Sequence, residues 1–495
     1  MMKVKEHIVV IIGAIILATA FLLLNSFSTH PILPCKESYI DSQIFQYMGY
    51  AMLNGKIPYT DLFDHKGLLL YVINAVGYII HQGWGVFILQ VINLAATITT
   101  WWKGLEFVED KKYKFILIVS MIFCLYVYYT YGNSTEEWSL FFLSYPMMVF
   151  YRQNSRGENQ ISKMNLYLIG LCIGCIFMLR LNNVAPVLGV ILYAAYKALK
   201  GKDYRYFTKA FFFIFLGWLT PILLSFAYMY IVGGTKGMYD MYYATVLFNI
   251  DYKAIYGGNP TLYDRTRFFY KAMMPALFAL LIIRKKLDYI FPLFLGYLIV
   301  IPATGKSENY VYLQGCLVLM VYTMACLDTH KLKYLFLIIL VGFHAKTFVK
   351  SASLSSFSLN KDGSDLMAIH EVLARVPHSE WDNIWQYGTC YMLKDLMTLH
   401  ILQPNRMFLN GQLNESYPLM KEERYKVQQI RPQYILTARY NKEKWMNETR
   451  EYDGSELDVL YIKKNYSIIA SAIGEDNTEI YLYKKNNSQD KTCRE

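Results

Sequence analysis

Four ionisable residues lie within six positions in the stretch TDLFDHKG: Asp61, Asp64, His65 and Lys66. Two carboxylates and an imidazole could ligate a metal ion, although their spacing is loose. An ammonium at the start of an apolar helix suits an anionic headgroup, which it binds as a point charge. The alternative for Lys66 is an anchor whose ammonium reaches up to the membrane surface. These side chains directly precede the apolar run at 67–80.

Three carboxylates elsewhere in the chain could also do chemistry. Asp41 follows the first apolar run, where it could act as a base or begin a helix as its N-cap. Glu136 and Glu137 stand together in the stretch GNSTEEW. Such a pair could bind an acceptor or a metal ion, or it could be favoured by the helix dipole after a cap at Ser134 or Thr135. The sequence leaves both interpretations open for each carboxylate.

Two basic residues lie at the ends of apolar runs. Arg180 emerges from the run ending in FML, two residues before Asn182. An arginine at this depth needs an acidic partner or a ligand, unless its side chain reaches the membrane interface. Lys306 lies in the short turn PATGKSENY, followed by Tyr310. The alternative for this turn is a simple connection with tyrosines at the interface.

The composition indicates which kind of protein carries these residues. Charged residues make up 18% of the 495 residues, against about 25% in soluble domains, and 55% are hydrophobic. The net charge of +11 does not indicate a nucleic-acid partner, because excess Lys and Arg gather in the cytoplasmic loops of membrane proteins. We therefore expect a polytopic α-helical protein of the cytoplasmic membrane that contacts the lipid bilayer and no nucleic acid.

The basic loops set the expected topology. If every apolar run crossed the membrane, the basic loop 103–114 would lie outside, against the positive-inside rule. We therefore interpret 67–80 as an amphipathic helix on the outer interface, which leaves about eleven transmembrane helices. The remaining runs lie near 8–24, 85–102, 115–130, 138–151, 165–179, 183–198, 210–231, 267–283, 288–301, 311–326 and 333–349. The N-terminus is then cytoplasmic, and the first loop, 25–84, lies outside.

The C-terminal part of the chain differs in character from the rest. From 351 to 495, helical patterns such as SDLMAIHEVLARV alternate with the strand-like stretches NIWQYG, RPQYILTA and EIYLYKK. That alternation predicts a soluble α/β domain, which the topology places outside the cell membrane. We therefore expect two domains, a transmembrane catalytic domain at 1–350 and an extracytoplasmic domain at 351–495.

The segment from Pro58 to Gly67, reading PYTDLFDHKG, resembles a motif of the C-type (GT-C) membrane glycosyltransferases. Within that class it is similar to the protein mannosyltransferase and aminoarabinose transferase superfamily. The resemblance is specific in the first 140 residues. It implies a GT-C fold, with Asp41 as the catalytic base and Lys66 as a contact of the carrier phosphate. Either Glu136 or Glu137 would be the second acidic residue.

The resemblance also implies a reaction. A sugar would pass from a polyprenyl-phosphate donor to a hydroxyl of a glycan, lipid or protein acceptor, with inversion and with Asp41 as base. Lys66, Lys306 and Arg180 would bind the donor phosphate; Lys306 falls where relatives carry a late turn with Arg and Tyr. The residues that would support this site are Tyr59, Asp64, His65, Asn182 and Tyr310. No cofactor is certain, and a divalent metal stays open.

Two other functions compete with this interpretation. A flippase or transporter of lipid-linked saccharides would place ionisable residues within its spans, whereas here most of them fall in outer turns. A polysaccharide polymerase or ligase would also act on the outer face but would use a lipid-diphosphate donor. Asp41, the DHKG stretch and the α/β tail favour the transferase. The sequence does not identify the sugar or the acceptor.

Overall fold

The computed structural model describes residues 2–29, 40–126, 129, 132–158, 160–250, 287–303, 314–328, 331–351, 364–387, 392–406, 426, 428–439, 456–473 and 479–486. The chain divides into two compact units. Unit 1 comprises Met1–Leu33, Lys66–Tyr228 and Leu247–Phe357, and unit 2 comprises Pro34–His65, Met229–Val246 and Ser358–Glu495. The domain boundary expected at 350 stays a prediction.

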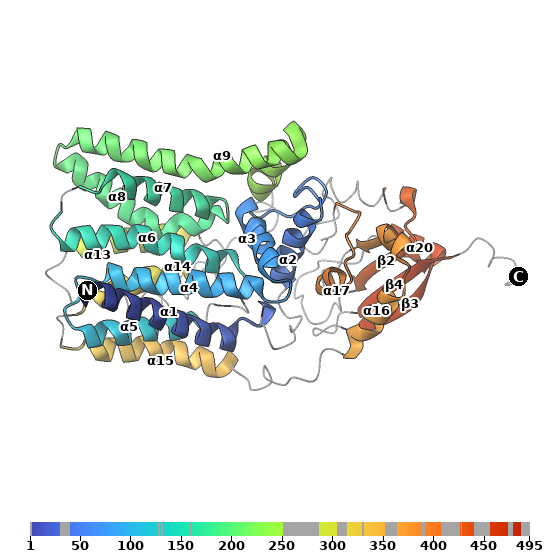
Figure 1. Ribbon diagram of the computed structural model, residues 1–495, viewed down its shortest axis with the longest axis horizontal. Helices are drawn as coiled ribbons and strands as arrows, with labels where there is room; N and C mark the ends of the chain where they lie inside the picture. Colours follow the sequence, from blue (N-terminus) through green and yellow to red (C-terminus); the bar gives the residue numbers. More distant parts are fainter. Residues whose placement is uncertain are drawn as a thin grey trace, which may run out of the picture. The chain divides into compact units, whose positions relative to one another are not determined.

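Unit 1 is a bundle of apolar helices (Figure 1). Its helices are α1 (Met2–Asn25), α3 (Leu68–Ile80), α4 (Gly85–Gly104), α5 (Lys111–Leu125), α6 (Thr135–Ser155), α7 (Lys163–Phe177), α8 (Ala185–Lys200), the first part of α9 (Tyr204–Tyr242), α13 (Leu287–Ala303), α14 (Gln314–Ala325) and α15 (Lys333–Ser351). α4 packs against α1 and α6, and α14 against α5 and α6. Every residue of α14 is buried, as expected for a helix that is apolar on all sides.

Side-chain caps fix where several of these helices begin. Ser134 accepts the backbone N–H of Glu137 and starts α6, while Ser162 and Asp110 do the same for α7 and α5. Small residues then let helices approach closely. A Cβ added at Gly170 of α7 would lie 2.0 Å from the carbonyl oxygen of Ile214 in α9, so only glycine permits this contact.

Three helices of the described chain are long and apolar enough to cross a membrane: Glu6–Asn25, Gly85–Gly104 and Tyr204–Ile250. Shorter apolar helices include Leu68–Ile80, Lys163–Phe177, Asp288–Val300, Gln314–Ala325 and Lys333–Gly342. These features are those of a helical membrane protein. The count of about eleven spans and the interfacial placement of 67–80 stay predictions. The expected span 267–283 lies outside the described residues.

Unit 2 is an α/β unit. Its elements are α2 (Ile40–Leu53), the end of α9, α16 (Ser364–Ala374), η8 (His378–Asn383), β1 (Ile384–Tyr387), α17 (Leu393–Thr398), β2 (Tyr434–Arg439), α20 (Glu456–Asn465), β3 (Tyr466–Ile473) and β4 (Glu479–Lys485). The strand order is β1-β2-β4-β3; β1 pairs parallel with β2, and the other pairs are antiparallel. Ile435, Leu436 and Leu482 are fully buried in this sheet. The three predicted strands are confirmed, and β3 was not predicted.

Candidate functional site

Glu136, in the first turn of α6, forms an ion pair with the half-buried Arg180. Glu136 is only 4% exposed, and its Oε1 accepts a hydrogen bond from Nη1 of Arg180 at 2.9 Å. Arg180 lies just before the short 3₁₀ helix η3 (Leu181–Val184), which leads into α8. The acidic partner expected for Arg180 is therefore Glu136. Burying the carboxylate of Glu136 is costly unless it is paired and hydrogen-bonded, as it is here.

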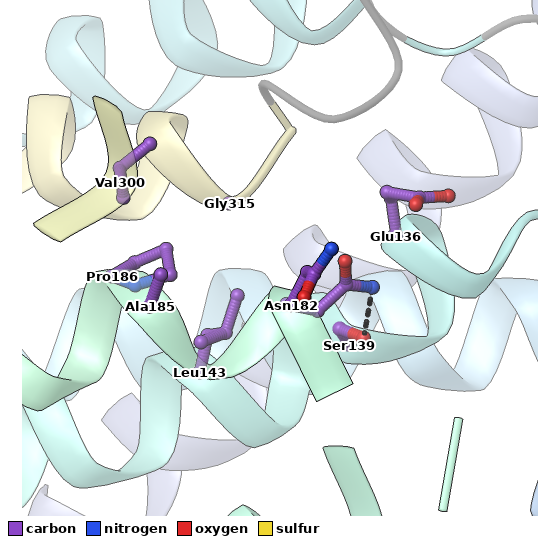
Figure 2. A pocket seen from close by; sticks show the side chains of 9 residues that line it. Glu136, Ser139, Leu143, Asn182, Ala185, Pro186, Val300 and Gly315 are labelled. Atoms are coloured by element: carbon purple, nitrogen blue, oxygen red, sulfur yellow. Dashed lines mark hydrogen bonds between the residues drawn. The ribbon is translucent and has the colours of Figure 1, made fainter. Parts of the chain in front are cut away.

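Glu136 lines a small, partly open pocket of unit 1, which leaves about 20 Å³ for the centre of a water molecule. Figure 2 shows Glu136 at one side of the pocket and apolar side chains at the other. Its lining residues are Glu136, Ser139, Leu143, Asn182, Asn183, Ala185, Pro186, Val300 and Gly315. Within it, Nδ2 of Asn183 donates to Oγ of Ser139 at 3.0 Å. The polar wall thus combines a carboxylate, two amides and a hydroxyl.

Glu137 lies on the other side of the same helix turn and is fully enclosed. Its Oε2 accepts hydrogen bonds from Nε2 of Gln90 at 2.9 Å and from the backbone N–H of Asn133 at 2.6 Å. Its Oε1 lies 2.5 Å from the hydroxyl of Tyr129. Glu137 belongs to the predicted outer turn 131–137, before the predicted span 138–151. Burial raises its pKa to about 7, although these hydrogen bonds favour the carboxylate.

The contacts of Glu137 continue into a buried polar network. Nδ2 of Asn133 donates to Oδ1 of Asn74 on α3, and the indole N–H of Trp138 donates to Oδ1 of Asn133. The amide of Gln90 on α4 also donates to Tyr129. The network therefore ties α3 and α4 to the turn that precedes α6. Its geometry gives Glu137 a structural task, whereas Glu136 lines the pocket.

The end of the DHKG stretch is bound to the residues before Arg180. The N–H of Gly67 donates to the carbonyl of Leu179, and the N–H of Leu69 donates to that of Met178, both at 3.2 Å. A Cβ on Gly67 would lie 1.9 Å from the Met178 oxygen, so the motif requires glycine here. Lys66 and Arg180 thus flank one pair of backbone contacts, and Lys66 itself is half-buried.

The start of the motif forms a tight loop in unit 2. Tyr59 is fully buried with φ of 65°, and its N–H donates to the carbonyl of Leu62 at 2.8 Å. The carboxylate of Asp61 accepts the N–H of Ile57 at 2.7 Å. Asp64 is 7% exposed and lies 3.3 Å from Nδ1 of His65. Tyr59, Asp64 and His65 are therefore brought together as a compact buried loop.

The remaining predicted residues fall into three groups. Asp41 lies in the first turn of α2, half-buried, a place that suits a helix start and a base equally. Asn182 lines the pocket beside Glu136. Lys306 and Tyr310 lie outside the described residues. Within unit 1 the structure thus joins Glu136, Arg180 and Asn182, whereas Asp41 belongs to unit 2.

Sequence reasoning missed several polar residues of these clusters. Ser139 follows Glu136 by three residues, so it could have been found from helical spacing, whereas Asn183 gave only its adjacency to Asn182. Gln90 and Asn74 gave no such signal, because a single amide in an apolar helix is compatible with many contacts. Their partners are 47 and 59 positions away in the sequence.

The sequence left open a metal site at Asp61, Asp64 and His65. Among the described residues, no group of three or more His, Cys, Asp or Glu side chains is arranged to hold a metal ion. In the motif itself, the carboxylate of Asp61 is engaged by a backbone N–H of its own turn.

Comparisons with known proteins give distant likenesses to solved structures. No family model matches the chain, and no curated protein matches it. Among solved structures, it is similar to the oligosaccharyltransferase of Archaeoglobus fulgidus, crystallised with zinc and sulfate. The two chains are 13% identical, with 86% of this chain and 67% of the other covered and a TM-score of 0.42. At that distance the likeness carries no argument, and the proposal below rests on the chain's own residues.

Proposed function

We propose that this chain is a membrane glycosyltransferase that moves a sugar from a polyprenyl-phosphate carrier to an acceptor hydroxyl on the outer face of the cytoplasmic membrane. The observation that carries the proposal is the ion pair of buried Glu136 with half-buried Arg180, together with the pocket that Glu136 lines beside amide and hydroxyl groups. A guanidinium next to neutral hydrogen-bonding groups suits a substrate that joins a phosphate to a sugar. The resemblance of the motif at Pro58 to Gly67 supports the same reaction.

In the proposed reaction, Asp41 accepts the proton of the acceptor hydroxyl while that oxygen attacks the anomeric carbon. The new carbon–oxygen bond forms opposite the phosphate, and the bond between the anomeric carbon and the phosphate oxygen breaks. The polyprenyl phosphate leaves with both bonding electrons, and the anomeric centre is inverted. Lys66 and Arg180 stabilise the charge on the leaving phosphate, with Lys306 as a third candidate.

Glu136 is the second acidic residue of this proposal. Its hydrogen bond to Nη1 holds the guanidinium of Arg180 in one orientation. Preorganised charges of this kind stabilise a transition state because they need not rearrange when the leaving group becomes negative. Ser139, Asn182 and Asn183 offer donors and acceptors that suit sugar hydroxyls.

The experiment that tests the proposal compares two conservative variants in isolated membranes. Asp41→Asn removes the base, and Asp382→Asn is the matched control, since Asp382 is exposed on η8. Membranes would receive a panel of labelled polyprenyl-phosphate hexoses and pentoses, and label in the acceptor fraction would be measured. We expect Asp41→Asn to lose transfer by roughly 100-fold or more, with no change in Asp382→Asn. Unimpaired transfer in Asp41→Asn would remove it as the base.

Failure of the wild-type chain to use any donor of the panel would contradict the proposed reaction itself. Analysis of the surface glycans of a deletion strain supplies an independent check, because it reports the missing sugar together with the polymer or lipid that carries it. We expect one sugar to disappear at one linkage. An unchanged glycan profile, together with unused donors, would favour a transporter or a polymerase.

A further inference from the structure

Residues 400–406 of the C-terminal part contact the start of the motif, and we call them the tail strap. Nε of Arg406 donates to the carbonyl of Tyr59 at 2.9 Å, and the N–H of Phe63 donates to the carbonyl of Arg406 at 2.8 Å. The guanidinium carbon of Arg406 also lies 5.8 Å from the centre of the Phe63 ring. Arg406 thus contacts both ends of the loop from Tyr59 to Phe63, through its side chain at Tyr59 and through its backbone at Phe63.

Asp240, near the end of α9, contacts both Arg406 and the loop. It is 7% exposed, and its Oδ1 lies 3.4 Å from Nη2 of Arg406. Its Oδ2 accepts the hydroxyl of Thr60 at 2.9 Å and lies 3.5 Å from Nζ of Lys236. A carboxylate buried to this extent requires such partners. Asp240 and Arg406 therefore form a charged clasp around the loop.

The tail strap also holds the helix that carries Asp41. The hydroxyl of Tyr47 on α2 accepts the N–H of Gln403 at 2.7 Å and donates to the carbonyl of Ile401 at 3.3 Å. The rings of Tyr50 and His400 lie 6.3 Å apart. The tail strap therefore contacts both α2 and the loop from Tyr59 to Phe63.

We propose that the C-terminal part positions the loop from Tyr59 to Phe63, with Arg406 as the positioning residue and Asp240 as its anchor. The proposal rests on the transferase function proposed above. The loop needs such support because its own conformation is unfavourable. Tyr59 has the left-handed backbone that a residue with a Cβ rarely adopts. The bond from Arg406 to the Tyr59 carbonyl stabilises that conformation from outside the loop.

The experiment measures hydrogen exchange and transfer kinetics on the full-length chain in detergent. Arg406→Met removes the clasp, Arg406→Lys keeps the charge but not the fork of donors, and Arg375→Met is the matched control. Arg375 directly follows α16, is 81% exposed and pairs only loosely with Glu371 at 3.9 Å. Exchange would be read at the amides of Tyr59 and Phe63 and, as an internal reference, at Leu436 and Leu482 in the sheet.

We expect Arg406→Met to speed exchange at Tyr59 and Phe63 by roughly tenfold, with little change in the sheet. In the same variant kcat should fall by roughly tenfold while KM for the donor changes little, because the loop is misplaced rather than removed. Arg406→Lys should recover part of both effects. Arg375→Met should show neither.

Unchanged exchange at Tyr59 and Phe63 in Arg406→Met would overturn the proposal. An equal rise in the sheet would do the same, because it would make Arg406 a general stabiliser of the tail. The two proposals can fail separately. If the wild-type chain transfers no sugar, the proposed function fails, while the exchange data still decide whether Arg406 shapes the loop.

Discussion

Glu136 and Glu137 are neighbours in the sequence, but the first turn of α6 gives them opposite surroundings. Glu136 forms an ion pair with Arg180 and lines a pocket with polar and apolar walls. Glu137 meets Gln90, Asn133 and Tyr129 in a site closed on every side. This difference supports the proposal that Glu136 takes part in the reaction, whereas the contacts of Glu137 hold the turn in place.

The comparison also explains why the two roles occur together. A carboxylate that borders a pocket must be held in place by something other than its substrate. Here the turn that presents Glu136 is fixed by the hydrogen bonds to Glu137 and by the cap at Ser134. The network behind the turn thus sets the position of the pocket's polar wall.

The largest effect is expected on the pocket side, from Arg180→Gln. It removes the cation and leaves Glu136 buried without its partner, so transfer should fall by roughly 100- to 1,000-fold. Arg156→Gln is the matched control, because Arg156 forms an exposed pair with Glu106. Initial rates with labelled donor would measure both. A loss of less than about threefold in Arg180→Gln would place the phosphate elsewhere.

In the buried network, Glu137→Ala should lower the stability of the protein and not only its transfer rate. It leaves the donors of Gln90 and Asn133 buried without this acceptor and opens a cavity. We expect the free energy of unfolding to fall by about 3 kcal/mol at pH 5. Denaturant titration in detergent, with Glu158→Ala as an exposed control, would measure it. A change below about 1 kcal/mol would contradict the structural role.

The pH dependence of stability sharpens the same assignment. Below pH 4.5 both folded and unfolded chains keep the proton of Glu137, but between pH 4.5 and 7 only the folded chain does, since burial raises this pKa to about 7. Stability from this group is therefore greatest below pH 4.5 and falls by about 2.5 kcal/mol as the pH rises to 7. Glu137→Gln, which mimics the protonated acid, should flatten that slope. An unaltered slope would assign the titration to another group.

The smallest effect is expected from Asn183→Ala in the polar wall. Losing a neutral hydrogen bond near Ser139 should raise KM for one substrate by roughly fivefold and leave kcat almost unchanged. The control is Asn165→Ala. Asn165 lies at the start of α7, and the change removes its contact with Tyr145 on α6. A fall in kcat with constant KM would move Asn183 from substrate binding to the chemical step.

The sequence predicted the helical membrane class and three of the strands, because hydrophobic periodicity is a local property. It also indicated that Arg180 needs an acidic partner or a ligand unless its side chain reaches the interface, from the cost of a lone charge at that depth. It could not choose between Glu136 and Glu137, because adjacent residues differ only in which neighbours the fold brings to them. The clasp of Asp240 with Arg406 was out of reach for the same reason, since its partners lie 166 positions apart.

The most direct test of the account compares Glu136→Gln with Glu137→Gln in one transfer assay. The two isosteric changes lie one residue apart, so expression and membrane insertion serve as internal controls. With a labelled polyprenyl-phosphate sugar that the wild-type chain uses, we expect Glu136→Gln to lose roughly 100-fold in rate and Glu137→Gln to stay within about threefold of wild type at pH 7. Equal losses in both variants, or a larger loss in Glu137→Gln, would contradict the division between pocket and network.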